Sequence, residues 1–133
     1  MTTAPLPRLL IIDDCDANLV FVRYMMTALG ADFDIARSET EAKALLAGES
    51  YGAVLIDHQP SRINALGLLD WMSGLEVKPR ALVTTTDPSR QIIQRLFDAG
   101  CDHFLHRPLS ANALCRLIPD MLFGHTDGLA LAG

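Results

Sequence analysis

The chain has 133 residues, half of them hydrophobic, and a formal net charge of −5 at pH 7. This length fits one domain with a single core. The apolar runs are far shorter than the roughly 20 residues of a membrane helix, and the start MTTAPLPR lacks the apolar segment of a secretory signal. The negative charge disfavours a broad contact with nucleic-acid phosphates. We therefore expect a cytoplasmic domain that contacts neither membrane nor nucleic acid directly.

Short apolar runs alternate with stretches of helical spacing along the chain. The runs are RLLIID (8–13), FDIAR (33–37), GAVLID (52–57), RALVT (80–84) and HFLH (103–106). Continuous apolar runs of this length are typical of strands buried on both faces. Five strands that alternate with five helices predict βαβ units, and thus an α/β fold with a mainly parallel, doubly wound sheet.

Capping residues and helix stops mark the ends of the predicted helices. In chain order they are Asp16 to Gly30, Ser38 with Glu41 as a capping box to Gly48, Asn64 onward, Asp87-Pro88 to Gly100, and Ser110 to a kink or end at Pro119. The expected buried positions are Val22, Met25, Met26 and Leu29, then Leu66, Leu69 and Trp71 or Met72, then Leu114, Leu117 and Ile118. We assign 7–123 to the domain, with tails at 1–6 and 124–133.

Polar residues follow the predicted strands. Asp13 and Asp14 follow the first strand, Asp57 ends the third, threonines 84–86 end the fourth, and Arg107 follows the fifth. Because the carboxyl ends of parallel strands lie at one edge of a sheet, where such folds bind ligands, we expect these groups to lie together.

Three carboxylates at one edge are suited to Mg²⁺ or a similar divalent ion such as Mn²⁺. A cation would also explain how Asp13 and Asp14 both stay ionised although they are adjacent. Asp57 has a second possible role, as a carboxylate nucleophile that forms an aspartyl phosphate. A hydroxyl and a cationic side chain nearby would then contact the phosphoryl oxygens.

With these residues the chain resembles the receiver domain of two-component response regulators, over roughly residues 7–123. The resemblance depends on Asp13-Asp14, on Asp57 after AVLI, on Thr85, and on the basic residue and proline Arg107-Pro108. It implies a flavodoxin-like (βα)5 fold with strand order 2-1-3-4-5.

The resemblance also implies roles for individual residues. Asp57 is the phosphoacceptor, and Asp13 and Asp14 hold Mg²⁺ with Asp57 and the backbone carbonyl of Gln59. The implied activity is phosphoryl acceptance rather than turnover, with at most autophosphorylation from small donors and autodephosphorylation. The implied partners are a histidine kinase or phosphotransfer protein, a downstream effector and a second copy of the chain.

By the same resemblance Thr85 is the switch hydroxyl, Phe104 is the switch aromatic, and the Arg107–Pro108 peptide is cis. The chain also departs from the family pattern. Arg107 replaces a lysine, and a planar guanidinium is not equivalent to a compact ammonium. Pro60 and Ser61 replace a usual Met-Pro pair.

Two other functions remain open beside the phosphoacceptor. A pseudo-receiver would keep the fold without being switched by phosphate, and Arg107 with the altered 60–61 loop favours it. An aspartate-nucleophile phosphatase is the distant alternative, since neither Asp13-Asp14 nor Asp57-His58-Gln59 supplies the D-x-D motif of one such class.

Several of these residues also have plain structural interpretations. Asp13-Asp14 is compatible with a loop that caps a helix, Thr85 with a strand residue and Phe104 with a core aromatic. His58, next to the acceptor, is interpreted as an exposed loop residue, with an alternative role in ordering water near the phosphoryl group.

The three cysteines are odd in number and lack metal-ligand spacing, which predicts free thiols in a reducing compartment. Cys101 and Cys115 are predicted core residues. Cys15 is interpreted as a small residue at a helix start, with redox sensitivity as the alternative.

Overall fold

The computed structural model describes residues 8–87 and 89–123. Strands and helices alternate throughout this range. They are β1 (Arg8–Ile12), α1 (Asp16–Ala28), β2 (Asp32–Ala36), α2 (Glu39–Gly48), β3 (Ala53–Asp57), α3 (Ala65–Met72), β4 (Arg80–Thr85), α4 (Arg90–Asp98), β5 (His103–His106) and α5 (Ala111–Phe123). The predicted tails at 1–6 and 124–133, the predicted first domain residue, Pro7, and Pro88 lie outside the described residues.

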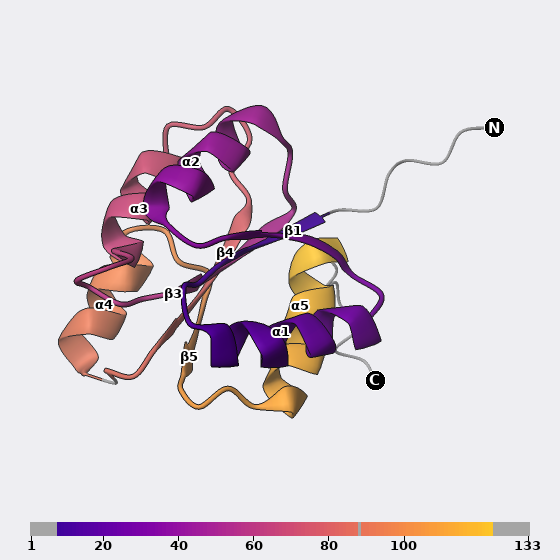
Figure 1. Ribbon diagram of the computed structural model, residues 1–133. Helices are drawn as coiled ribbons and strands as arrows, with labels where there is room; N and C mark the ends of the chain where they lie inside the picture. Colours follow the sequence, from indigo (N-terminus) through magenta and orange to yellow (C-terminus); the bar gives the residue numbers. More distant parts are fainter. Residues whose placement is uncertain (1–7, 88, 124–133) are drawn as a thin grey trace, which may run out of the picture.

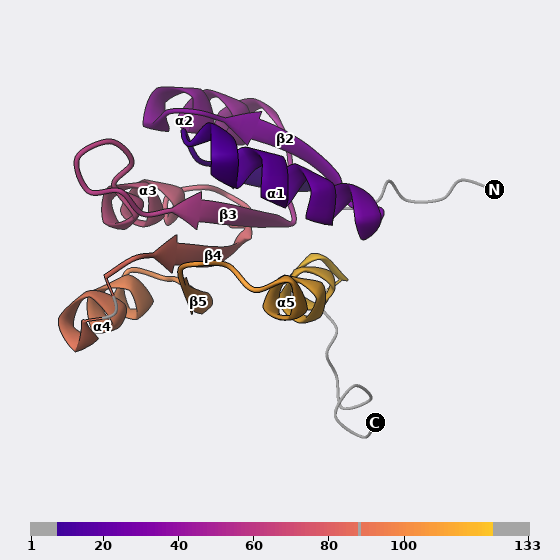
Figure 2. The same cartoon turned by 60° about the horizontal axis from the view of Figure 1, so that its bottom comes forward.

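The strands form one parallel sheet in the order β2-β1-β3-β4-β5, which confirms the expected fold. Helices α1 and α5 cover one face of the sheet, and α2, α3 and α4 cover the other (Figures 1 and 2). None of the described helices is long and apolar enough to cross a bilayer. The carboxyl ends of β1, β3 and β4 therefore meet at one edge, between the two helical layers.

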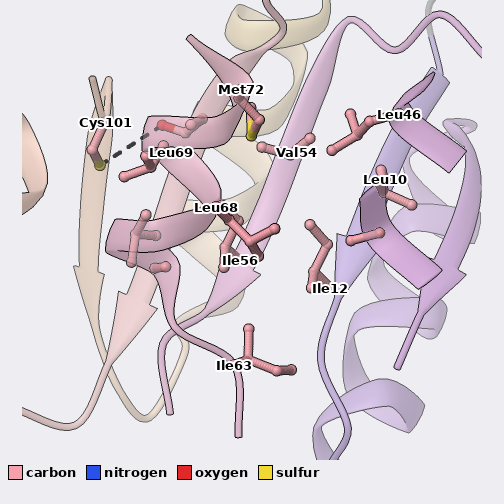
Figure 3. Packing of buried hydrophobic residues seen from close by; sticks show 14 of the residues in the cluster. Leu10, Ile12, Leu46, Val54, Ile56, Ile63, Leu68, Leu69, Met72 and Cys101 are labelled. Carbon is pink, nitrogen blue, oxygen red and sulfur yellow. Dashed lines mark hydrogen bonds between the residues drawn. The ribbon is translucent and has the colours of Figure 1, made fainter. Parts of the chain in front are cut away.

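Alternate strand residues enter two different core clusters, because successive side chains of a strand point to opposite faces. In β1, Leu9 and Ile11 pack on the α1–α5 side, whereas Leu10 and Ile12 pack on the side of α2, α3 and α4. Figure 3 shows the second cluster, in which strand residues meet α3. Its labelled members are Leu10, Ile12, Leu46, Val54, Ile56, Ile63, Leu68, Leu69, Met72 and Cys101.

Two of the predicted helix caps are wrong. Helix α1 begins after Cys15, with no side-chain cap, and the carboxylate of Asp16 accepts instead from Arg37 Nη2 at 2.7 Å. Helix α4 is capped by Ser89, whose hydroxyl accepts from Ile92 N. Asp87 lies two residues earlier, where its carboxylate accepts from the N–H of Ser89. Both aspartates are therefore engaged by groups that periodicity alone does not identify.

The caps of α2 and α3 are where the sequence placed them. The Ser38 hydroxyl accepts from Glu41 N, although the Glu41 carboxylate closes the turn by accepting from Arg37 N rather than from Ser38 N. The Asn64 side chain accepts from the first N–H groups of α3. In α3, Met72 rather than the half-buried Trp71 fills the core, together with Leu68 and Leu69. Leu66 and Leu29 are only half-buried.

Helix α5 continues through Pro119 to Phe123, so of the predicted kink or end at this proline, the end is wrong. Residues on both sides of the proline are buried against the sheet and α1, namely Leu114, Ile118, Met121 and Leu122. This burial outweighs the backbone hydrogen bond that proline cannot donate. Leu117 is half-buried, and Cys115 is exposed rather than in the core, whereas Cys101 is buried.

Candidate functional site

Two buried carboxylates and one arginine form the centre of the site. Asp13 follows β1 and Asp57 ends β3, and both are almost completely buried. Arg107, which follows β5, donates from Nε to Asp57 Oδ1 at 2.8 Å and from Nη2 to Asp13 Oδ2 at 3.2 Å. One guanidinium therefore bridges the carboxylates of two neighbouring strands. Its planar fork makes this double contact possible, and a single ammonium would not reproduce it in the same geometry.

Asp13 lies in an environment that opposes its ionisation. Burial raises the pKa of Asp13 to about 6, against the N–H of Cys15, which donates to Asp13 Oδ1 and lowers it. The neighbouring carboxylate of Asp57 raises this pKa further, and the Arg107 guanidinium lowers it. The arginine thus offsets part of the charge repulsion that two adjacent buried carboxylates create.

Asp14 turns away from this bridge. Its Oδ2 lies 2.8 Å from Nε of Arg62, in the loop between β3 and α3. Its other oxygen, Oδ1, is buried and has no hydrogen-bond partner. Sequence reasoning did not identify Arg62 as a site residue. The sequence does place Arg62 in the loop after the third strand, at the same edge of the sheet as Asp14, and this position could have identified it as a site residue.

The β3–α3 loop is closed by backbone hydrogen bonds around Gln59. Gln59 N donates to Ile63 O, and the Gln59 carbonyl accepts from the N–H groups of Arg62 and Ile63, both at 2.7 Å. These two bonds use both lone pairs of the carbonyl that was expected to ligate a metal. The Gln59 side chain donates to Asp57 Oδ2 at 3.2 Å. Ile63 is fully buried in the core near Ile56, and its burial anchors the loop to the domain (Figure 3).

The threonine beside Asp57 is Thr84 in this structure. Thr84 pairs with Asp57 in the sheet register, and its hydroxyl lies 3.4 Å from Asp57 Oδ1. The hydroxyl of Thr85 accepts instead from the N–H of Asp87.

Phe104 is half-buried and packs against the cluster beneath α4. The switch roles expected for Thr85 and Phe104 remain predictions. The Arg107–Pro108 peptide bond is cis.

His58 is buried, so its interpretation as an exposed loop residue is wrong. Its Nδ1 accepts from the N–H of Ala65 at the start of α3, at 3.1 Å. Burial lowers the pKa of His58, against the neighbouring carboxylates of Asp57 and Asp87, which raise it. The imidazole thus connects the residue after Asp57 to the helix behind the site.

The resemblance implies a divalent cation at this edge, and the donor chemistry for such an ion is present. Carboxylate oxygens are ligands that Mg²⁺ prefers, and the unpartnered Oδ1 of Asp14 is a buried oxygen that a cation would satisfy. The arrangement is nevertheless not that of a closed metal centre. Within residues 8–87 and 89–123, no group of three or more His, Cys, Asp or Glu side chains is arranged to hold a metal ion. The other expected ligand oxygens are engaged by Arg107, by Arg62 and by backbone N–H groups.

A parallel sheet of this order, with an acidic pair, a strand-terminal aspartate and a basic residue followed by proline at one edge, defines a receiver-type α/β domain. A family model described as the response regulator receiver domain matches residues 9–119. The chain therefore belongs to the response regulator receiver domain family of two-component signalling.

Similar proteins include parts of much longer kinases. The aerobic respiration control sensor protein ArcB of Escherichia coli is 30% identical over 127 residues, which cover 86% of this chain and 15% of that protein. The hybrid signal transduction histidine kinase L of Dictyostelium discoideum is 26% identical over 121 residues, which cover 85% of this chain and 7% of that protein. The chain thus spans a small fraction of the length of these relatives.

Solved structures show the same fold. A CheY-like receiver domain protein from Methanospirillum hungatei has a TM-score of 0.82 at 23% identity, covering 90% of this chain and 96% of that one. The receiver domain of a histidine kinase from Syntrophus aciditrophicus has a TM-score of 0.79 at 18% identity, covering 91% and 95%. At these identities the likeness supports the fold alone.

Proposed function

We propose that this receiver domain accepts a phosphoryl group on Asp57 from a histidine kinase or phosphotransfer protein, in a Mg²⁺-dependent reaction. The observation that carries the proposal is the position of Asp57. It ends a central strand, and its carboxylate contacts the guanidinium of Arg107 at 2.8 Å. A strand-terminal carboxylate beside a fixed cation is suited to nucleophilic attack on phosphorus with stabilisation of the transferred charge.

The residues of the chain divide the work of this transfer. An oxygen of Asp57 forms a bond to phosphorus while the bond from phosphorus to the donor's histidine nitrogen breaks. Arg107 and the Gln59 amide orient the Asp57 carboxylate, and afterwards Arg107 contacts the phosphoryl oxygens. A divalent cation held by Asp13, Asp14 and Asp57 would offset the negative charge shared by these carboxylates and the phosphoryl group.

The acquired phosphate would signal through the face formed by α4, β5 and α5, to an effector or a second copy of the chain. Thr85 lies on β4, between the strand of Asp57 and β5, and Phe104 lies on β5 within this face, which supports them as the relay. The free thiols of the described cysteines support a reducing compartment, the cytoplasm, as the place of action.

The pseudo-receiver is the second candidate, and one observation favours it. Arg107 already holds Asp13 and Asp57 together, and Arg62 pairs with Asp14, so each site carboxylate has a cationic partner from the chain itself. Such a site is partly neutralised without metal or phosphate. The domain would then act as an interaction module whose conformation phosphate does not change.

Intact-mass spectrometry after incubation with acetyl phosphate and Mg²⁺ distinguishes the two candidates. The parent should gain one phosphoryl mass, and Asp57→Asn should gain none. Asp70→Asn, which changes an exposed aspartate on α3, is the matched control and should be labelled like the parent. A parent that remains unlabelled, under conditions that label another receiver domain, would establish the pseudo-receiver instead.

A further inference from the structure

We propose that Arg62 is a positioning residue that competes with the divalent cation, so that metal binds this receiver only in exchange for the Arg62–Asp14 ion pair. The inference deepens the proposed function and rests on it, because it concerns how the phosphoacceptor site is regulated. It assigns a role to a loop arginine that the phosphoryl-transfer chemistry does not use.

Arg62 contacts two of the expected metal ligands at once. Its side-chain Nε lies 2.8 Å from Asp14 Oδ2, and its backbone N–H donates to the Gln59 carbonyl at 2.7 Å. One residue therefore binds both the carboxylate and the carbonyl that a cation would need. Release of the Arg62 side chain frees Asp14 Oδ2, whereas the Gln59 carbonyl becomes available when the loop movement also breaks its bonds from the N–H groups of Arg62 and Ile63.

The ion pair leaves Asp14 incompletely satisfied. Its Oδ1 is buried and accepts no hydrogen bond, which is a costly state for a carboxylate oxygen. A divalent cation with its bound waters would supply a partner for this oxygen. Asp14 thus has two favourable states, one paired with Arg62 and one bound to a divalent cation. The exchange replaces the guanidinium by the metal ion.

Exposure decides which arginine is released. The side chains of Arg62 and Asp14 are 55% and 23% exposed, and ion pairs in contact with water contribute little to stability. The side chain of Arg107 is only 11% exposed and contacts two buried carboxylates. Removing such a buried partner is far more costly. Metal entry therefore displaces Arg62 first and leaves the Arg107 bridge in place.

The chain offers a matched control. Arg37 forms an ion pair with Asp16 at the same edge of the sheet, with Nη2 2.7 Å from Oδ1 and a side chain 52% exposed. Arg37→Ala and Arg62→Ala each remove one positive charge from this edge. Of these two arginines, Arg62 alone contacts expected metal ligands, so the two variants separate the proposed exchange from a general change in the electrostatic field.

The test measures binding of Mn²⁺ alone to the full chain, by calorimetry and by electron paramagnetic resonance of the free ion. Arg62→Ala should bind Mn²⁺ roughly two- to five-fold more tightly than the parent, the factor that corresponds to losing an exposed competing ion pair. Arg37→Ala should raise the affinity less. In the parent, added Mg²⁺ should shift the amide resonances of Arg62 and Ile63, which donate to the Gln59 carbonyl.

Three results would overturn the inference. They are an unchanged or weaker Mn²⁺ affinity in Arg62→Ala, an equal gain in Arg37→Ala, and the absence of metal binding in both parent and Arg62→Ala. Because no phosphodonor is present, the experiment is independent of Asp57 phosphorylation. A parent that takes no phosphate but shows the Arg62 effect contradicts the proposed function alone.

Discussion

Nδ1 of His58 accepts a hydrogen bond from the backbone N–H of Ala65, and the two atoms are 3.1 Å apart. Ala65 opens α3, and His58 directly follows Asp57. The imidazole therefore ties the start of α3 to the end of the central strand. Because Nδ1 acts as the acceptor, the neutral ring carries its proton on Nε2.

Replacing His58 should lower the stability of the fold. His58→Ala leaves the Ala65 N–H buried without a partner, which should cost about 1–3 kcal/mol in the free energy of unfolding. His58→Asn keeps an acceptor near Nδ1 and should lose less. Urea unfolding at pH 7.5 measures both values. Equal losses in the two variants would show that packing, not the hydrogen bond, explains the effect.

The same residue gives a pH dependence with a definite sign. Since burial lowers the pKa of His58 from its ordinary value of 6.5, the unfolded chain binds the proton first as the pH falls. The contribution of neutral His58 to the free energy of unfolding is therefore fully present above pH 6.5 and decreases as the pH falls below it. Asp13, whose pKa is raised to about 6, gives the opposite slope, so the parent is compared with His58→Asn. Parallel pH profiles of the two proteins would contradict the prediction.

The Asn64 cap can be tested at the neighbouring position. Its Oδ1 accepts from Leu66 N at 3.1 Å and Gly67 N at 3.4 Å. Asn64→Ala should destabilise the domain by about 1 kcal/mol, whereas Asn64→Asp keeps an equally good cap and should be nearly neutral. Thermal unfolding of the three proteins provides the measurement. A loss of similar size in Asn64→Asp would mean that the amide nitrogen, and not the cap, matters.

The cysteines should differ in reactivity. Burial raises the pKa of the Cys101 thiol to about 11, and its Sγ lies 2.7 Å from the His103 carbonyl within the core. Native protein treated with iodoacetamide should be modified at the exposed Cys115 and more slowly at Cys15, with Cys101 protected until unfolding. Peptide mapping reads out each site. Rapid labelling of Cys101 at pH 7.5 would refute its burial.

Because the pKa of Cys101 is raised in the folded state, the stability of the fold should also decrease as the pH rises from about 9 to 11.

Arg107 should limit the response of the domain to phosphate. Its fork holds both Asp13 and Asp57, whereas the Thr85 hydroxyl accepts from the N–H of Asp87. We therefore expect the phosphate mimic BeF₃⁻ with Mg²⁺ to cause only small amide NMR shifts at Thr85 and Phe104 in the parent. Arg107→Lys, with a smaller and more mobile cation, should give larger shifts. Large shifts in the parent, unchanged by lysine, would mean that arginine is a tolerated variant.

The sequence by itself determined the element order, the parallel sheet and the edge at which the polar groups meet. These features follow from local information, because an apolar run of strand length or a helical spacing of apolar residues can be recognised within a short stretch of the chain. Ser38 and Asn64 were predictable as caps for the same reason, since a cap bonds N–H groups two or three residues away. The predicted cap at Asp16 was wrong, because the carboxylate of Asp16 binds Arg37 on another segment of the chain.

Only the tertiary structure decided which charges pair inside the site. Arg107 is separated from Asp13 by 94 residues and from Asp57 by 50, and no local pattern indicates that one guanidinium reaches both. The pairing of Arg62 with Asp14 and the burial of His58 likewise depend on how the β3–α3 loop folds over β1 and α3. Residue type and spacing specify which groups reach the edge of the sheet. Their partners are selected by distance and burial in three dimensions, because ion pairs and hydrogen bonds form only between groups that packing brings into contact.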